Sequence, residues 1–97
     1  MTADQLSLLR ERMDAINARL CAVLQERAAL CREIGAWKHR HGVPAADPAR
    51  ESAMLASLTA EPGAGFDQGA LERILRCVLE ESRRIVERCQ RSPNSGP

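Results

Sequence analysis

The chain has 97 residues, which suffices for one domain or for one subunit of an assembly. Its 44% hydrophobic and 28% charged residues are typical of a folded globular protein. The net charge of +1 and the 2% aromatic content argue against nucleic-acid binding by basic patches or by base stacking. Neither a run of about 18 apolar residues nor a signal-peptide pattern occurs, so no membrane contact is expected and the expected location is the cytoplasm.

The cysteines and the single lysine carry further information. The four cysteines form no C-x-x-C pair and have no histidine at ligand spacing, so no metal site is expected. We interpret them as small buried hydrophobic residues in a reducing compartment; they are Cys21, Cys31, Cys77 and Cys89. Lys38 is the one lysine among 14 basic residues, which hints that a compact ammonium group is needed there.

A heptad pattern predicts a very long first helix. Thr2 and Gln5 resemble a capping box at its start, and Gly42-Val43-Pro44 should end it. The apolar residues that recur in steps of three and four are Leu6, Leu9, Met13, Ile16, Leu20, Val23, Leu30, Ile34 and Trp37. About 39 helical residues span about 58 Å, whereas a compact chain of this size has a radius of gyration near 13 Å. The rest of the chain cannot cover this seam, so we predict an obligate homodimer.

Two further helices and no strand are expected, which makes the fold class all-α. Asp47 should cap the second helix, with Pro48 at its first position and an end before Pro62. The third helix should begin near Asp67. We predict one helical domain over residues 1–91 and a disordered tail over residues 92–97.

Several polar residues fall where the helical patterns require apolar ones. Arg27 occupies a seam position of the first helix, where it either points outward, pairs with a partner-helix glutamate, or binds an anion. Arg50 and Glu51 are predicted on the same side of the second helix as Met54, Leu55 and Leu58, which should be buried, unless this first turn frays into solvent.

Ser82 occupies a seam position of the third helix, either bonding its own i−4 carbonyl or serving a site. Arg27 and Lys38 lie on nearly the same helix face, about 16 Å apart, so a small dianion could lie between them. Arg10 is about 42 Å from Lys38 along the helix and could join that site only from an antiparallel partner chain.

Taken in order, these residues resemble the all-helical (AroQ-type) chorismate mutases over about residues 5–90. The matching segments are Leu9-Arg10-Glu11-Arg12-Met13-Asp14-Ala15-Ile16, Gln25-Glu26-Arg27-Ala28-Ala29-Leu30, Ile34-Gly35-Ala36-Trp37-Lys38 and Asp47-Pro48-Ala49-Arg50-Glu51. The resemblance implies an intertwined homodimer of three-helix chains. It also implies the Claisen rearrangement of chorismate to prephenate in phenylalanine and tyrosine biosynthesis, without metal or cofactor.

The resemblance also implies a role for each site residue. Arg27 and the partner chain's Arg10 would clamp the two carboxylates, and Lys38 would reach a carboxylate and the ether oxygen. Glu51 and the backbone at Asp47 would take the ring hydroxyl, supported by Arg50. Ser82 would bind the ring carboxylate.

One position departs from the family pattern. A glutamine, or sometimes a glutamate, follows the serine by one helical turn in the family and donates to the ether oxygen, whereas this chain has Val86. A missing transition-state donor typically costs about 2.7–4 kcal/mol. Two alternatives to a chorismate mutase therefore stay open: a related enzyme acting on isochorismate or aminodeoxychorismate, and a weakly catalytic helical dimer that regulates a partner enzyme.

Overall fold

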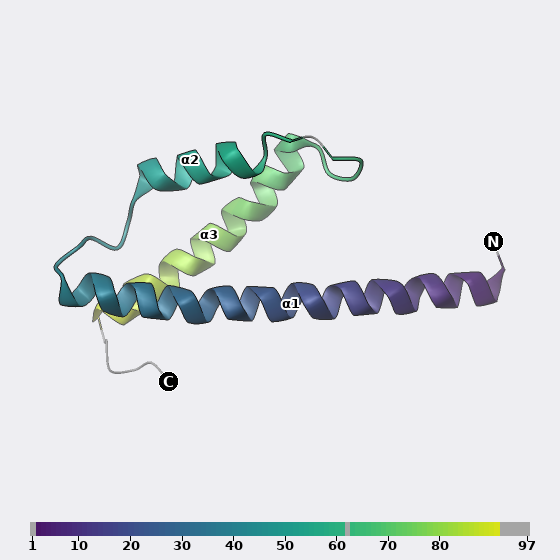
Figure 1. The fold of residues 1–97 in the computed structure, drawn as a ribbon, viewed down its shortest axis with the longest axis horizontal. Helices are drawn as coiled ribbons and strands as arrows, with labels where there is room; N and C mark the ends of the chain where they lie inside the picture. The colour runs from purple at the N-terminus through teal and green to yellow at the C-terminus, as the bar shows by residue number, and fades with distance from the viewer. Residues whose placement is uncertain (1, 62, 92–97) are drawn as a thin grey trace. The chain divides into compact units, whose positions relative to one another are not determined.

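The computed structural model describes residues 2–61 and 63–91, which form three helices and no strand. Helix α1 spans Ala3–Arg40, α2 spans Pro48–Leu58 and α3 spans Gln68–Arg91 (Figure 1). The all-α prediction is confirmed. The tail predicted to be disordered, residues 92–97, lies outside the described residues. Within the described part of the chain, no helix is long and apolar enough to cross a membrane.

The predicted helix ends are confirmed in detail. Thr2 and Gln5 exchange hydrogen bonds at the start of α1, with Thr2 N donating to Gln5 Oε1 over 2.7 Å and Gln5 N to Thr2 Oγ1 over 3.2 Å. At the other end, Gly42 has φ +65° and Val43 N donates to Lys38 O over 2.9 Å. A left-handed glycine followed by this bond is a Schellman ending, which satisfies the last carbonyls of α1.

The chain divides into two compact units, residues 1–30 and residues 31–97. Among the described residues of the first unit none is buried, and only Arg27 and Ala28 are even half-buried. The unit is a single helical stretch whose large apolar side chains are 38–59% exposed from Leu6 to Leu30. A helix that exposes a continuous apolar stripe lacks the packing that normally stabilises it.

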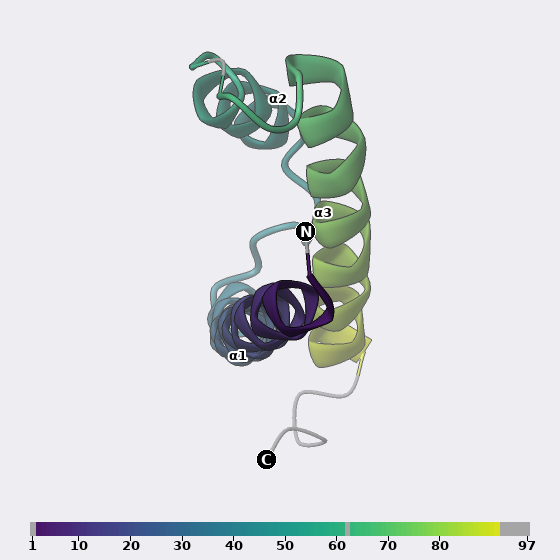
Figure 2. The same ribbon diagram turned by 90° about the vertical axis from the view of Figure 1, so that its right-hand side faces the viewer.

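The second unit has a core of its own. Its buried apolar residues come from all three helices: Cys31, Leu55, Leu79, Val86 and Cys89. Helices α2 and α3 lie side by side in both ribbon views (Figures 1 and 2). The buried Thr59 follows α2; its Oγ1 donates to Leu55 O over 2.7 Å and accepts from Gln68 Nε2 over 3.4 Å.

The C-terminal turns of α1 approach α3 closely because residue 35 is a glycine. A Cβ atom placed on Gly35 would lie 2.7 Å from the Cβ of Cys89 and 3.2 Å from the backbone of Val86. Real Cβ atoms essentially never come within 3.0 Å of another heavy atom, so a larger residue at position 35 would force the two helices to shift. This crossing fixes the region of α1 that contains Lys38 against the region of α3 that contains Val86.

The cysteine prediction is half right. Cys31 and Cys89 are buried, as expected, whereas Cys21 and Cys77 are exposed in the single chain. Cys21 lies in the uncovered first unit, and Cys77 on a side of α3 that the other helices leave open. Position beside an apolar stripe therefore does not by itself bury a thiol.

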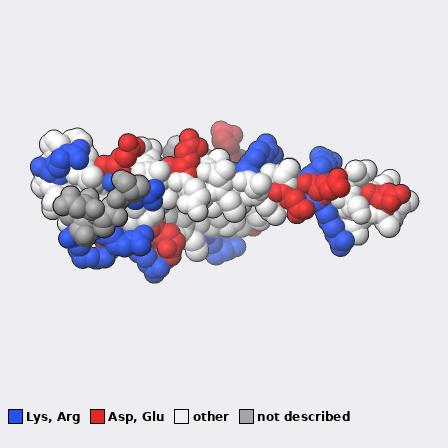
Figure 3. Space-filling view, turned by 90° about the horizontal axis from the view of Figure 1, so that it is seen from below, with Lys and Arg blue, Asp and Glu red and all other residues white. Residues whose placement is uncertain are grey.

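Charged residues of both signs are distributed over the face seen in Figure 3. This distribution agrees with the near balance of 14 basic and 13 acidic residues.

Candidate active site

Six of the predicted site residues belong to the second unit. They come from the end of α1, the start of α2 and the middle of α3: Lys38, Asp47, Arg50, Glu51, Ser82 and Val86. Arg10 and Arg27 belong to the first unit, where Arg10 is exposed and Arg27 is half-buried. The unit that holds most of the predicted site is thus the unit that has a packed core.

Lys38 is tied to the loop that leads into α2. Its Nζ donates to the carbonyl oxygen of Ala45 over 3.0 Å, and the side chain is half-buried. Two residues further along, Asp47 caps α2, with its Oδ1 accepting from Arg50 N over 3.1 Å. The ammonium group of Lys38 is therefore held beside the loop that leads into α2.

Gln90 fixes the same loop from α3. Its Nε2 donates to Val43 O over 2.8 Å, across 47 positions of the chain. The sequence pattern contained no sign of this bond, because an exposed glutamine near a helix end has no preferred partner. The loop between α1 and α2 is thus bonded at Val43 by α3 and at Ala45 by Lys38.

The buried face of α2 agrees with the predicted one at Glu51 and Leu55 but not at Arg50 and Leu58. Glu51, Leu55 and Thr59 form the stripe toward α3, with Leu55 6% and Thr59 1% exposed. Leu58 is 58% exposed and Arg50 is also exposed, so the prediction that Arg50 and Leu58 lie on the buried side is wrong for the single chain. The helix turns so that the i, i+4, i+8 row packs, which is the closest ridge on a helix surface.

Glu51 makes an ion pair that links α2 to α3. Arg83 Nη2 donates to Glu51 Oε2 over 2.8 Å. The two side chains, with Leu55 and Leu79, border a hollow of about 360 Å³ between the two helices. The hydrogen bond and the charge of Glu51 raise the pKa of Arg83 above its ordinary value. Sequence reasoning missed Arg83, because Arg84 next to it looks identical until the packing of α3 is known.

Ser82 and Val86 lie one turn apart on α3. Ser82 Oγ donates to Val78 O over 2.7 Å, the local bond that the sequence analysis considered as an alternative to a substrate contact. Val86 is 8% exposed and its backbone lies at the crossing with Gly35. A substrate carboxylate would have to draw the hydroxyl of Ser82 away from its own helix.

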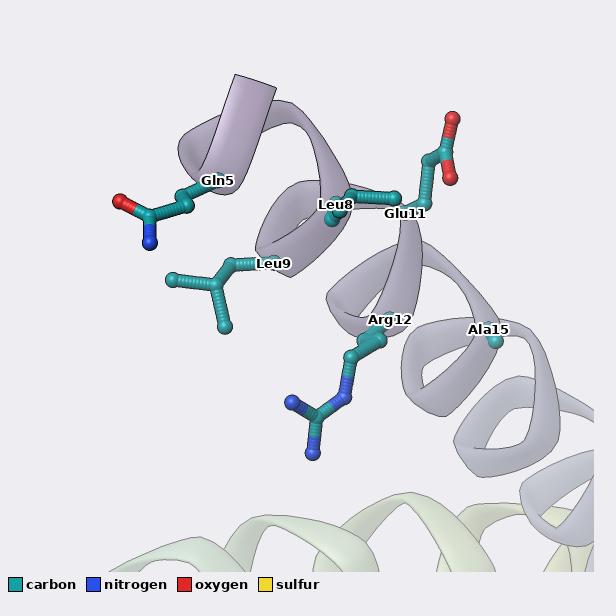
Figure 4. Close-up of a pocket in the computed structure, with 6 residues that line it drawn as sticks. All are labelled: Gln5, Leu8, Leu9, Glu11, Arg12 and Ala15. Atoms are coloured by element: carbon teal, nitrogen blue, oxygen red, sulfur yellow. The ribbon is translucent and has the colours of Figure 1, made fainter. Parts of the chain in front are cut away.

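The first unit contains a second hollow, of about 760 Å³, near the start of α1 (Figure 4). Leu9 and Arg12 point to one side of the helix there, while Glu11 points to the other. Arg10 is not among its lining residues, which are Gln5, Leu8, Leu9, Glu11, Arg12 and Ala15. The lining therefore mixes apolar residues, among them Leu9 of the exposed stripe, with charged ones, and it includes no residue of the predicted site.

No group of three or more histidine, cysteine or acidic residues within 2–61 and 63–91 could hold a metal ion. Within the second unit, Lys38 provides a half-buried ammonium group and Arg50 an exposed guanidinium group, both of which are donors that carboxylates bind. Such a set can orient carboxylates and stabilise developing negative charge.

Comparison with known proteins identifies the family. The sequence profile of chorismate mutase type II matches residues 9–87, most of the chain. The chain belongs to the type II chorismate mutase family. A solved structure, form II of the chorismate mutase from Thermus thermophilus, superposes with a TM-score of 0.83 at 33% identity, covering 87% of this chain and 96% of that one.

Curated relatives carry two kinds of name. The T-proteins of Enterobacter agglomerans and Haemophilus influenzae are 38% and 36% identical over 80% and 81% of this chain, which spans only about a fifth, 21%, of their length. The 4-amino-4-deoxychorismate mutase of Streptomyces pristinaespiralis is 30% identical over 87% of this chain and 66% of its own. The family is therefore established, and the names of the similar proteins contain two related substrates, chorismate and 4-amino-4-deoxychorismate.

Proposed function

We propose that this chain converts chorismate to prephenate as a chorismate mutase of phenylalanine and tyrosine biosynthesis. The observation that carries the proposal is the match of the type II profile to residues 9–87, a span that includes every residue expected to contact the substrate. In the reaction the ether C–O bond breaks as a C–C bond forms, so no group is transferred and no nucleophile is needed. The protein's task is to orient a flexible dicarboxylate and to stabilise its transition state.

In this proposal the positive groups have distinct roles. Arg27 and the partner chain's Arg10 clamp the carboxylates, and Lys38 donates to the ether oxygen as its negative charge grows. Glu51 and the backbone at Asp47 hold the ring hydroxyl, with Arg50 beside them, and Ser82 binds the ring carboxylate. The hydrogen bond of Lys38 supports this role. Its Nζ donates to the carbonyl oxygen of Ala45 in the loop before α2, and a substrate oxygen could replace that carbonyl as the acceptor.

The proposal includes a homodimer in which the first unit of each chain covers the other. Its support is the apolar stripe of α1, where Met13, Leu20 and Val23 are 55–58% exposed in the single chain. Burying apolar surface contributes about 25 cal/mol per Å², so a stripe of this length gives a large drive for association. We also propose a cytoplasmic location, supported by the four cysteines occurring as free thiols.

A spectrophotometric assay of chorismate consumption and prephenate formation tests the reaction. We expect turnover by the purified protein without added metal or cofactor. A folded protein that leaves chorismate unchanged would contradict the proposal and favour a weakly catalytic dimer that regulates another enzyme.

Mixing two inactive variants tests the contribution of Arg10 across the dimer. Arg10→Ala and Arg27→Ala chains should each lose activity, because each lacks one carboxylate clamp. After exchange, a mixed dimer has one site with both lesions and one with neither, so about a quarter of the sites should be intact. Mixed chains that stay inactive although they exchange would show that Arg10 serves no site in its partner.

A second candidate substrate is 4-amino-4-deoxychorismate. The relative that bears this activity in its name is 30% identical to the chain. Val86, at a position where the family has a polar donor, is the feature of this chain that is consistent with an altered site. Assaying both compounds side by side separates the two candidates.

A further inference from the structure

Arg83 has no role in the proposed reaction, yet it contacts the carboxylate assigned to the ring hydroxyl. Its Nη2 atom binds one oxygen of Glu51 over 2.8 Å, and the two side chains are 41% and 27% exposed. Both residues lie in the second unit and border the same hollow between α2 and α3. In the proposed site, the ring hydroxyl of chorismate is the substituent at ring position 4. The contact between Arg83 and Glu51 is therefore part of the corner where this substituent would lie.

The charges around Arg83 are mainly acidic. Besides Glu51, the carboxylates of Glu87 and Glu80 act on its guanidinium and raise the pKa of Arg83, which is cationic at neutral pH as every arginine is. Glu80 is also 3.4 Å from Arg84, and Arg76 borders the same hollow. Removing the charge of Arg83 would leave Glu51 in a corner of higher negative potential.

The two candidate substrates differ in charge at that corner. As their names state, an amino group replaces the oxygen of chorismate at position 4 in 4-amino-4-deoxychorismate, and an aliphatic amine is protonated near neutral pH. A hydroxyl group can donate to a carboxylate that is already balanced by an arginine. An ammonium group would gain less from that carboxylate and would be repelled by the guanidinium beside it.

We propose that Arg83 makes this site select a dicarboxylate with a neutral hydroxyl group at ring position 4 over one with an ammonium group. This inference rests on the proposed function, in which Glu51 receives the position 4 substituent. Arg83 acts through Glu51 and is a positioning residue: it neutralises and orients the carboxylate without touching the substrate. The same chain with an uncharged residue 83 would accept the amine more readily.

Three variants, assayed on chorismate and on 4-amino-4-deoxychorismate, test the proposal. Arg83→Met removes the charge and keeps the apolar stem, whereas Arg83→Lys keeps the charge. Arg84→Met is the control: it removes the neighbouring arginine, which is 61% exposed and pairs with Glu80 and Glu81 rather than with Glu51. We expect the ratio of kcat/KM for chorismate over the amine to fall about tenfold in Arg83→Met, a size limited by solvent screening. Arg83→Lys should keep most of the selectivity, and Arg84→Met all of it.

Selectivity that is unchanged in a folded Arg83→Met protein would overturn the inference, as would an equal change in Arg84→Met or a wild type that prefers the amine. Circular dichroism and sedimentation show whether each variant is folded and associated as the wild type is.

Calorimetric binding of the two compounds separates this inference from the proposed reaction. A wild type that binds both compounds without turning them over contradicts the reaction, and the binding ratio across the three variants then decides the selectivity. A wild type that binds neither compound overturns both.

Discussion

The two units of this chain show two different ways in which a helix can depend on its surroundings. In residues 31–91, short helical stretches pack on each other and bury Leu55, Leu79 and Val86 to 6–8% exposure. In residues 3–30, a helix of equally regular pattern contains no fully buried residue. The comparison teaches that heptad spacing specifies which face of a helix must be buried. Whether the same chain can bury that face, or a second chain is needed, depends on the rest of the sequence.

The largest effect should come from a charge placed on the uncovered stripe. Ile16→Glu would put a carboxylate into the proposed dimer seam, where an unpaired buried charge costs several kcal/mol. We expect loss of the folded dimer, because dissociation leaves the first unit without cover. Sedimentation and circular dichroism measure both consequences.

Ala18→Glu is the matched control for Ile16→Glu. Residue 18 is exposed and lies two positions further along the helix, about 200° round from residue 16, so the same charge should remain in solvent. An Ile16→Glu protein that stays a folded dimer would show that the first unit is stabilised in some way other than by this seam.

The next effect concerns Lys38 in the second unit. Lys38→Ala should lower kcat by a factor of about 10² or more, the usual result of removing a donor to a developing oxyanion. The lost hydrogen bond to Ala45 O should reduce stability by only about 1 kcal/mol. Arg40→Ala, two residues away and exposed, should leave activity unchanged. A Lys38→Ala protein that keeps its activity would show that Lys38 has a structural role, through its bond to Ala45 O, and no role in the reaction.

Gly35 offers a test confined to the packing of the second unit. Gly35→Ala would force a Cβ to within 2.7 Å of Cys89 Cβ, and overpacking of this kind costs about 1–3 kcal/mol. The melting temperature should fall by about 4–8 °C for each kcal/mol. The gain in helix propensity offsets part of this loss.

Gly69→Ala in α3 is the control for Gly35→Ala, because its added Cβ meets only the flexible end of Arg73 at 3.4 Å and Asp67 at 3.6 Å. It should be neutral or slightly stabilising. Equal melting temperatures for the two variants would show that α1 and α3 can separate slightly at no cost.

The helices and their ends could be predicted because each depends on a few neighbouring residues. Asp47 with Pro48, and Thr2 with Gln5, define helix starts through local hydrogen bonds that need no knowledge of the fold. Gly42 similarly defines an end through its own backbone conformation. Such signals remain valid whatever the helices pack against.

The features that sequence reasoning missed depend on how one helix is rotated against another. The face of α2 was predicted to include both Leu55 and Leu58, whereas the packing buries Leu55 and leaves Leu58 exposed; the two residues lie about 60° apart round the helix, so a small rotation decides between them. The same rotation brings Glu51 to Arg83, 32 positions away, rather than to solvent. Nothing in the pattern of α3 distinguishes Arg83 from Arg84, so this pair could be found only in three dimensions.

The smallest expected effect is a gain in kcat from a substitution at residue 86, which is both part of the core and part of the proposed site. Val86 is buried beside the Gly35 crossing, and in the proposed site it stands where a second donor to the ether oxygen is expected. In the proposed reaction, Val86→Gln supplies this second donor, and kcat should rise about tenfold, which requires about 1.4 kcal/mol. The gain should appear in kcat rather than in KM, because the charge on the ether oxygen develops only during the reaction.

Val86→Met separates the donor from the shape of the side chain. Methionine is unbranched and of similar length to glutamine but cannot donate, so it should reproduce any cost of repacking beside Gly35 without the gain in kcat. A glutamine amide that finds no partner in this buried position would lower the melting temperature more than methionine does. If Val86→Gln is less stable than Val86→Met and no faster, residue 86 belongs to the core of the second unit alone, and Lys38 is the side chain on which the ether oxygen depends.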